Sequence, residues 1–498
     1  MSGRERFFRS GAMLAAVGLS IRTVAMLFGA FVTRSVGAEG TGLYTVIMTV
    51  YSFAVTFATS GISLTVTRLV AEAVGEGNEG RIGGVIRGAV LYSATFGIAA
   101  SLLLFFGAGI IGEGILHDGR TVSSLRLLSL SLLPAALGSA LSGYFVGVRR
   151  VGFNAAAQVL TQMGKVVITV ALVIRASGQG TVASVGALCT GIVLTEGIGF
   201  LISLLQFLYD RRRHGGRSDA PRVGEVVATA VPLALSAYVR SALLTLEHVL
   251  IPARLRDSGE SSATAYAHYG ILHGMALPLI LYPMSPLSSF SGLLVPELAA
   301  GEGGDRRMNR IASEAMGATL AYSTVAAVLL SLFSEELGYA VYDSYEAGRY
   351  IGVLALIVPI MYMDHVTDSM LKGVGEQVYS MWVNISDSVL SVLLVWFLIP
   401  RLGIMGYALV IVIMEGYNFT LSLLRLRRRL RIRLDIRGAF ALPLAFSLIA
   451  ALLTKSLFLF AGSGAGALLL VLKLTFALSV IVALFALSGC LRRDRRNI

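Results

Sequence analysis

The sequence predicts an all-α polytopic membrane protein of about fourteen transmembrane helices, arranged as two six-helix lobes in a parallel repeat plus two C-terminal helices. Three observations predict this fold class. The composition is too apolar for a surface that faces water, long apolar runs recur along the whole chain, and the first half of the chain is repeated in the second half.

The composition indicates that lipid solvates most of this protein. Hydrophobic residues make up 55% of the 498 residues, charged residues make up 14%, and the mean hydropathy is +0.77. A soluble domain carries roughly a quarter of its residues as Asp, Glu, Lys or Arg. In a soluble protein the net charge of +12 would suggest a nucleic-acid partner, but here the basic residues stand in short segments between apolar runs. We therefore expect no nucleic-acid partner.

Apolar runs long enough to cross about 30 Å of hydrocarbon recur from one end of the chain to the other. We expect helices near residues 11–33, 43–71, 85–109, 122–147, 153–175, 181–208, 223–250, 265–298, 309–333, 349–371, 378–400, 404–425, 438–460 and 465–490. The gaps between these runs are short, so no soluble domain fits between them.

The distribution of charge predicts that both termini are cytoplasmic in a multi-pass protein of the cell membrane. Cytoplasmic loops carry an excess of Lys and Arg. Basic clusters fall on alternate connections, at residues 149–150, 210–222, 306–310 and 425–437, and in the tail at 492–496. The loop at 334–346, on the opposite side, is acidic and aromatic. Two cytoplasmic termini require an even number of spans.

The first half of the sequence recurs in the second half at an offset of about 226 residues. Leu69-Val-Ala-Glu corresponds to Leu294-Val-Pro-Glu, and Gly147-Val to Gly373-Val. In the sixth helix of the repeat the offset falls to 219, where Glu196-Gly corresponds to Glu415-Gly. A unit of six helices re-enters the membrane with the same orientation, so its copy is related by an axis along the membrane normal. The predicted domains are residues 1–215, 216–430 and 431–498, and the last of these holds the two added helices.

Polar side chains inside the apolar runs are candidates for the substrate path, because each charge costs at least a few kcal/mol at bilayer depth. The fifth helix carries Gln158, Gln162 and Lys165, and the equivalent stripe of the eleventh helix carries Asn384 and Asp387. Steps of three and four residues place each stripe on one helix face. The alternative is that these side chains only join helices through hydrogen bonds.

Arg22 in the first helix and Arg240 with Glu247 in the seventh helix are further candidates. A guanidinium group offers bidentate donors to phosphate, so a cationic cavity of Arg22, Lys165 and Arg240 would suit a pyrophosphate headgroup. The alternative for these arginines is a buried ion pair with another helix, or a side chain that reaches the membrane interface.

The tenth and eighth helices carry two more candidate features. Asp364 and Asp368 share a helix face at i, i+4 and could hold a proton or cation between them, unless Lys372 or a neighbouring helix neutralises them. The eighth helix contains hinge candidates that remove backbone hydrogen bonds, or that only make static kinks: Pro278, Pro283 and Pro286.

Motifs of soluble enzymes are lacking in the sequence. It contains no Walker loop, no His-Glu-x-x-His and no nucleophile elbow. The two cysteines give no metal-binding spacing. We therefore expect no enzyme activity, no catalytic residues, no metal, no cofactor and no ATP site, with H⁺ or Na⁺ as a possible coupling ion.

Four motifs follow one another in an informative order. Val36-Gly-Ala-Glu-Gly-Thr-Gly-Leu-Tyr44 joins the first two helices, and Leu246-Glu-His-Val-Leu-Ile-Pro252, Gly274-Met-Ala-Leu-Pro278 and Asp368-Ser-Met-Leu-Lys-Gly373 come later. Together they resemble the polysaccharide-exporter and stage V sporulation protein B-like branch of the multidrug/oligosaccharidyl-lipid/polysaccharide superfamily. The resemblance covers nearly the whole chain.

The resemblance implies two six-helix lobes around a central cavity and the flipping of lipid-linked saccharides by alternating access. It also implies that the two added helices form a groove for the lipid tail. Arg22 falls where this branch commonly has a basic residue, whereas Gly29 stands where a second basic residue is often found.

The sequence therefore predicts a flippase or exporter that moves a lipid-linked oligosaccharide or cell-wall precursor across the cytoplasmic membrane. The alternative is a cation-coupled multidrug antiporter that uses Asp364, Asp368 or Glu247 as its coupling site. An alternative of another class is a non-transporting membrane scaffold or receptor. We expect a monomer whose partners are the lipid-linked substrate and membrane lipids.

Overall fold

The structure is a computed structural model that describes residues 3–176, 178–214, 219–299, 304–458 and 467–488. The side chains of residues 3–22 lie outside the described set. All regular elements in the described ranges are helical, and no strand occurs among them. The predicted all-α fold class is confirmed.

Contacts divide the chain into two compact units. The N-unit is Ser35–Ala267, and the C-unit combines Met1–Arg34 with His268–Ile498. Helix α1 (Gly3–Thr59) crosses the first boundary and is interrupted at Gly37, whose φ of 73° and ψ of 179° are not helical. The remaining helices of the N-unit are α2 (Ile62–Gly75), α3 (Glu79–Gly109), the π-helix η1 (Ile110–Ile115), α4 (Arg120–Ser129), α5 (Leu132–Gly147), α6 (Val151–Ala176), α7 (Thr181–His214) and α8 (Val223–Asp257).

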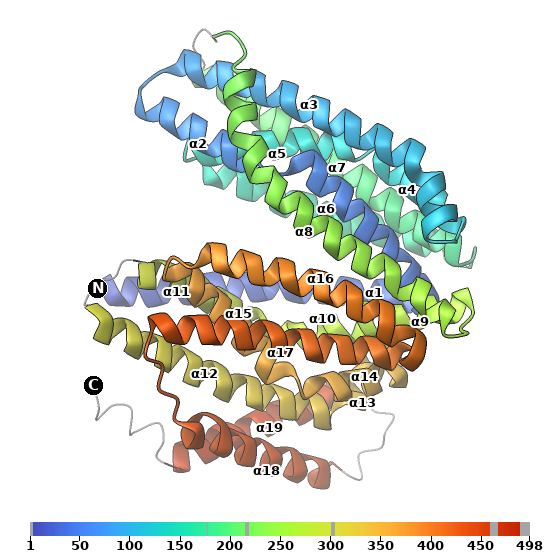
Figure 1. Cartoon of the computed structure of the whole chain (residues 1–498), viewed down its shortest axis with the longest axis vertical. Coiled ribbons are helices and arrows are strands. Elements are labelled where there is room, and N and C mark those ends of the chain that lie inside the picture. The colour runs from blue at the N-terminus through green and yellow to red at the C-terminus, as the bar shows by residue number, and fades with distance from the viewer. Residues whose placement is uncertain (1–2, 177, 215–218, 300–303, 459–466, 489–498) are drawn as a thin grey trace. The chain divides into compact units, whose positions relative to one another are not determined.

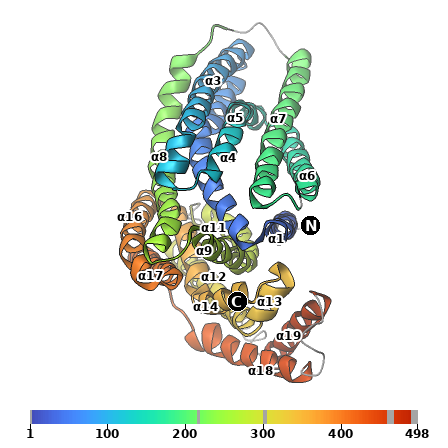
Figure 2. The ribbon, with the colours of Figure 1, turned by 90° about the vertical axis from the view of Figure 1, so that its right-hand side faces the viewer.

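The C-unit contains the N-terminal part of α1 and all elements from the eighth predicted helix onward (Figures 1 and 2). After α9 (Ser262–Tyr269), which spans the second boundary, its elements are η2 (Gly270–Ala276), α10 (Leu277–Leu281), η3 (Tyr282–Met284), α11 (Ser285–Ala299), α12 (Gly304–Leu332), α13 (Ser334–Tyr342), α14 (Tyr345–Ala355), α15 (Val358–Gly373), α16 (Gln377–Leu402), α17 (Ile404–Arg429), η4 (Arg437–Ala441), α18 (Leu442–Leu457) and α19 (Ala467–Leu487).

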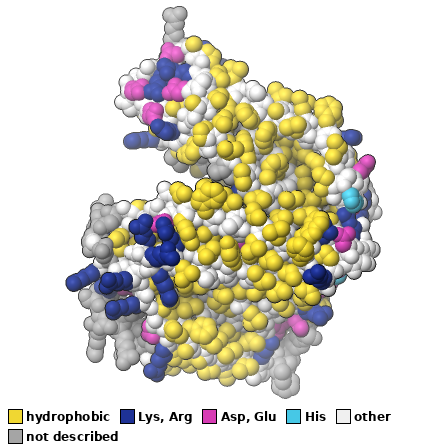
Figure 3. Space-filling model, in the orientation of Figure 1, with side chains coloured by type: hydrophobic (Ala, Val, Ile, Leu, Met, Phe, Trp, Pro, Cys, Tyr) yellow, Lys and Arg dark blue, Asp and Glu magenta, His cyan; other side chains and the backbone are white. Residues whose placement is uncertain are grey.

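The helices have the lengths and surfaces of membrane spans. Within the described ranges, twelve segments are long and apolar enough to cross a membrane, and a thirteenth is added if α14 and α15, which meet at a bend of 61°, form one span. Figure 3 shows hydrophobic side chains over the flanks of the helices and charged side chains gathered near helix ends. The count of fourteen stays a prediction, because the first two predicted helices overlap one segment, Thr23–Gly75.

The two compact units differ from the predicted domain boundaries, because the first helix belongs to the C-unit and α8 belongs to the N-unit. Glycines explain the position of α8. A Cβ on Gly61 would lie 2.3 Å from the carbonyl oxygen of Ala230, and one on Gly88 would lie 2.8 Å from the backbone of Arg222. Only residues without a side chain allow α8 and the segment before it to lie directly on α2 and α3.

Equivalent close contacts in the two units support the predicted duplication. A Cβ on Gly147, at the end of α5, would lie 2.8 Å from the Cβ of Val70. A Cβ on Gly373, at the end of α15, would lie 3.1 Å from the carbonyl oxygen of Val295. Both members of each pair are related by the sequence repeat, so the same helix crossing is built twice.

The segment that follows the sixth helix of each repeat docks in a similar way. In the N-unit, the backbone N–H groups of Asp219 and Arg222 donate to the carbonyl oxygens of Gly80 and Gly84 on α3, both at 3.0 Å. In the C-unit, the N–H groups of Arg431 and Arg433 donate to side chains on α12, Asn309 at 2.7 Å and Ser313 at 3.0 Å. Helix α8 therefore follows the first lobe as α18 follows the second. Helix α18 packs on α12, and α19 lies beside α18 (Figures 1 and 2).

Candidate functional site

Arg240 lies in the middle of α8. It is 17 residues from either end of the helix, which is about 26 Å at 1.5 Å per residue. Its side chain is exposed and has no ion-pair or hydrogen-bond partner among the described residues. When α8 spans the membrane, a residue at its centre lies near mid-bilayer, where an exposed guanidinium group is costly unless water or an anionic ligand solvates it.

Glu247 and His248 follow Arg240 two turns later on the same helix. Both side chains are half-buried, and both take part in polar interactions. Glu247 therefore lies on α8 as predicted, and the distance along the helix excludes a tight ion pair with Arg240. The predicted role of this carboxylate in binding stays a prediction.

The polar stripe of the fifth predicted helix, α6, divides into two parts. Gln158 and Gln162 are exposed, whereas Lys165 is half-buried and interacts electrostatically with Glu196 of α7. Other members of the stripe join helices: Ser142 donates to the Asn154 side chain at 2.9 Å, and a Cβ on Gly199 would lie 2.7 Å from the Thr161 hydroxyl oxygen. The polar face of α6 therefore carries both side chains that pack against neighbouring helices and side chains that are exposed.

The C-unit brings three carboxylates together near the middle of α15, α16 and α17. The charge of Asp364 interacts with Asp368 and Asp387, and the charge of Glu415 interacts with Asp364 and Asp387. One carboxyl oxygen of Asp364 is buried without a hydrogen-bond partner. Repulsion among these acidic groups disfavours the state in which all three are charged.

Asp368 has a different environment from Asp364. Lys372 donates to its carboxylate at 2.6 Å, and Ser380 of α16 also donates to it. The Asn384 side chain donates to the Ser380 carbonyl oxygen at 2.8 Å and so fixes the same turn of α16. The neutralisation by Lys372 that the sequence left open is therefore a direct ion pair for Asp368, whereas Asp364 interacts with Lys372 only electrostatically.

The remaining predicted site residues are Arg22 and the three hinge prolines. Arg22 lies in α1, and its side chain is outside the described set. The predicted hinge prolines stand where the eighth helix departs from α-helical geometry: Pro278 follows the π-helix η2, Pro283 lies in the 3₁₀-helix η3, and Pro286 is the second residue of α11. Whether they act as hinges stays a prediction.

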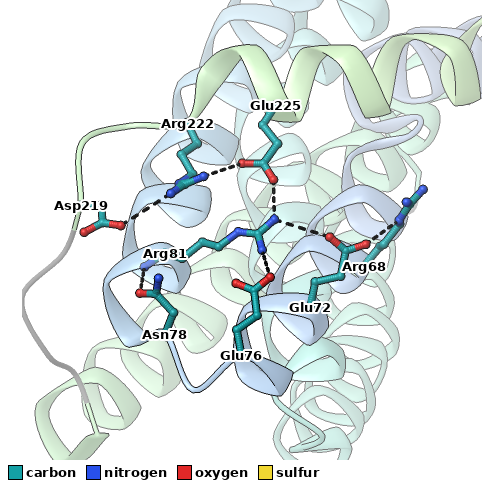
Figure 4. A network of polar contacts seen from close by, with 8 residues as sticks. All are labelled: Arg68, Glu72, Glu76, Asn78, Arg81, Asp219, Arg222 and Glu225. Atoms are coloured by element: carbon teal, nitrogen blue, oxygen red, sulfur yellow. Dashed lines mark hydrogen bonds and ion pairs between the residues drawn. The ribbon is translucent and has the colours of Figure 1, made fainter.

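A network around Arg81 was not predicted from the sequence. Arg81 pairs with Glu76 at 2.5 Å, with Glu225 at 2.7 Å and with Glu72 at 3.5 Å, and Arg222 pairs with Glu225 at 3.2 Å (Figure 4). The network ties the turn between α2 and α3 to the start of α8. Glu225 lies 144 residues from Arg81, so no local sequence pattern could have indicated this partner.

A second unpredicted feature is an ion pair that joins the start of the fifth helix to the end of the sixth helix in each repeat. In the N-unit, Arg150 pairs with Asp210, which also accepts a hydrogen bond of 2.6 Å from Tyr144. In the C-unit, Arg425 and Arg429 pair with Glu376 at 2.8 Å and 2.5 Å. These hydrogen bonds, from Arg425 above all, hold the pKa of Glu376 below its usual range.

Family comparison identifies the chain. Residues 7–302, more than half of the sequence, match the family described as polysaccharide biosynthesis protein. The chain belongs to this family. Residues 259–397 also match the MatE family. The predicted resemblance is confirmed.

Three curated proteins of Bacillus subtilis (strain 168) resemble this polysaccharide biosynthesis family member. Stage V sporulation protein B is 25% identical over 426 residues, which cover 82% of this chain and 81% of that protein. Sporulation protein YkvU is 21% identical, with 70% and 78% covered. The lipid II flippase MurJ is 22% identical, with 74% and 73% covered.

Solved structures show the same fold as this family member. A lipid II flippase MurJ in an inward closed conformation superimposes with a TM-score of 0.73 at 14% identity, over 97% of this chain and 99% of the other. An inward-facing multidrug resistance MATE family transporter superimposes with a TM-score of 0.64 at 16% identity, over 83% and 98%. The likeness to the flippase includes the two added helices, because it extends over nearly the whole chain.

Proposed function

We propose that this protein moves a lipid-linked oligosaccharide or cell-wall precursor across the cytoplasmic membrane, and that Arg240 binds the anionic headgroup. Membership of the polysaccharide biosynthesis family, similarity to the lipid II flippase MurJ and the multi-pass fold all support a flippase or exporter. The observation that carries the proposed headgroup site is the exposed guanidinium of Arg240 at the middle of α8. Guanidinium groups bind the oxygens of phosphates in pairs.

The proposed coupling site is the set of carboxylates Asp364, Asp387 and Glu415. Their mutual repulsion makes occupancy by H⁺ or Na⁺ favourable, and occupancy that changes with conformation would couple an ion gradient to substrate movement. Lys165 and the exposed Gln158 and Gln162 would add polar contacts to the transport path.

The match of residues 259–397 to the MatE family and these carboxylates favour one second candidate, a cation-coupled drug antiporter. This candidate has less support for two reasons. The polysaccharide biosynthesis family matches a longer stretch, residues 7–302, and the superposition with the higher TM-score is on a lipid II flippase. We further propose a monomer with both termini cytoplasmic and no ATP site. Surface labelling of single cysteines at either end in intact cells tests the orientation.

The experiment is transbilayer movement of a fluorescent undecaprenyl-pyrophosphoryl saccharide in proteoliposomes. Wild type is compared with Arg240→Gln and Arg22→Gln, which remove the charge and keep much of the side-chain volume. A charge-assisted hydrogen bond is worth about 1.5–3 kcal/mol, so we expect a loss of roughly tenfold to a hundredfold in the rate for Arg240→Gln.

Arg126→Gln is the matched control, because Arg126 is an exposed arginine in the first half of a span of the same unit and lies over the Phe105 ring. It should move the lipid at the wild-type rate. An unchanged rate in Arg240→Gln would overturn the headgroup site. If wild type does not move the lipid but drives efflux of cationic dyes with an ion gradient, the antiporter is supported instead. If wild type does neither, a non-transporting scaffold or receptor is supported.

A further inference from the structure

A groove with hydroxyl groups in an otherwise apolar lining lies between α8 and the part of α1 that follows Gly37, inside the N-unit. Its volume is about 380 Å³. Its lining comes from four residues of each helix: Thr45, Met48, Thr49 and Ser52 on α1, and Ser241, Leu244, Thr245 and His248 on α8. Six of these eight side chains carry a polar group, although both segments are apolar enough to span a membrane.

The groove follows the line along which the two helices meet. They run antiparallel and touch where Gly61 meets the backbone of Ala230. Beyond this point the rings of Phe57 and Tyr238 fill the space, with centroids 5.4 Å apart, and the Tyr238 hydroxyl donates to the Phe57 carbonyl oxygen at 3.1 Å. Further along, hydroxyl groups of α8 bridge to α1: Ser241 donates to the Thr56 hydroxyl at 3.3 Å, and Thr245 donates to the Thr49 carbonyl oxygen at 3.5 Å.

The hydroxyl groups of the groove are arranged as acceptors. Thr45 donates to the carbonyl oxygen of Thr41 at 2.7 Å, and Thr49 donates to that of Thr45 at 2.9 Å. A hydroxyl has one donor and two acceptor lone pairs, so these groups retain lone pairs for a ligand. The groove therefore suits a ligand that is rich in O–H and N–H donors and has C–H surfaces for Met48 and Leu244.

Arg240 borders this groove. Leu244, a lining residue, is one turn after Arg240 on the same face of α8. A pyrophosphate held by Arg240 would place the group attached to it beside the hydroxyl lining. Saccharides have the required combination of hydroxyl donors and C–H faces.

We infer that the groove between α1 and α8 is a saccharide subsite, in which the hydroxyls of Thr49, Ser241 and Thr245 accept hydrogen bonds from the sugar next to the pyrophosphate. This inference rests on the proposed function, since the pyrophosphate at Arg240 positions the sugar. It assigns recognition of the saccharide to the N-unit and to residues outside the cationic site.

The test is equilibrium binding of two lipids to the full-length protein in nanodiscs: undecaprenyl pyrophosphate, and the same lipid with a disaccharide attached. The groove variant is Thr49→Val/Ser241→Ala/Thr245→Val. The control is Thr190→Val, because Thr190 also donates to a carbonyl of its own helix, at 2.8 Å, but lies on α7 and not in the groove.

Wild type and the control should bind the disaccharide lipid more tightly than the saccharide-free lipid. The groove variant should lose about tenfold in affinity for the disaccharide lipid, because two or three hydrogen bonds are removed, and should bind the saccharide-free lipid as wild type does. Arg240→Gln should lower the affinity for both lipids.

A groove variant that keeps the full preference for the disaccharide lipid overturns the subsite and leaves the headgroup site intact. Equal weakening of both lipids in a variant with the wild-type melting temperature also overturns it, because the groove would then not distinguish the saccharide. Binding of neither lipid by wild type overturns the proposed function and the subsite together.

Discussion

The ion pairs that close the fifth and sixth helices of the two repeats differ in the direction of their charges. In the N-unit the cation, Arg150, precedes the fifth helix and the anion, Asp210, lies near the end of the sixth. In the C-unit the anion, Glu376, precedes the equivalent helix and the cations, Arg425 and Arg429, lie near the end of its partner. Arg150 and Glu376 are repeat equivalents, as are Asp210 and Arg429.

The exchange shows that the two repeats share an ion pair at the same place, although the residues that form it differ. The attraction depends on opposite signs at a short distance, so either direction stabilises the same crossing of helices. The middle of the same helices shows the opposite behaviour. Glu196 has Lys165 beside it in the N-unit, whereas Glu415 has Asp364 and Asp387 beside it in the C-unit. There the net charge itself differs between the two units.

The largest expected effect comes from reversing one charge of the N-unit pair. Arg150→Glu places a carboxylate against Asp210, whose side chain is only 3% exposed. Breaking such a pair costs about 3 kcal/mol or more, so the melting temperature in detergent should fall by several degrees.

The double variant Arg150→Glu/Asp210→Arg copies the arrangement of the C-unit and should recover most of that loss. Incomplete recovery is expected, because the hydrogen bond from Tyr144 to Asp210 is lost as well. If the double variant is less stable than Arg150→Glu, the equivalence of the two pairs is wrong.

The next largest effect distinguishes the two half-buried glutamates, Glu196 and Glu415. Glu415→Gln should abolish most of the dependence of lipid movement on an imposed H⁺ or Na⁺ gradient, since it removes one of three clustered carboxylates. Glu196→Gln should leave that dependence in place, because Lys165 already balances the charge of Glu196. The measurement is the ratio of transport rates with and without the gradient. Equal ratios in both variants would contradict a coupling site confined to the C-unit.

The smallest effect concerns pH and Glu376. Its arginine partners lower its pKa in the folded state, so its ion pairs stabilise the fold above the unfolded pKa of about 4.3. This stabilisation is lost as the pH falls through the lower folded value. Wild type should therefore be more stable than Glu376→Gln at pH 7, and the difference in melting temperature should shrink below about pH 4.

Glu335→Gln is a control for the pH comparison, because Glu335 is an exposed acidic residue in the first turn of α13, away from the pairs of Glu376. A difference between wild type and Glu376→Gln that is constant from pH 7 to pH 4 would show that the glutamate acts through shape and not through charge.

Several features were predictable because they depend on local pattern. Apolar runs predicted the helices, and the matched Gly147 and Gly373 predicted the duplication that the close contacts with Val70 and Val295 support. The i, i+4 spacing brought Asp364 and Asp368 to one face, but their different environments depend on Ser380 and Asp387 of the neighbouring helix. The roles of the candidate residues in transport stay predictions.

The sequence by itself determined that this protein is helical, membrane-embedded and duplicated, because hydrophobicity and periodicity are properties of adjacent residues. The tertiary structure alone decided which helices pack together. It assigned α8 to the N-unit through Gly61, Gly84 and Gly88, and it brought Arg81 to Glu225 and Arg150 to Asp210. Such contacts form because segments far apart in the sequence approach closely in space. The spacing of residues along the chain does not specify which distant segments meet.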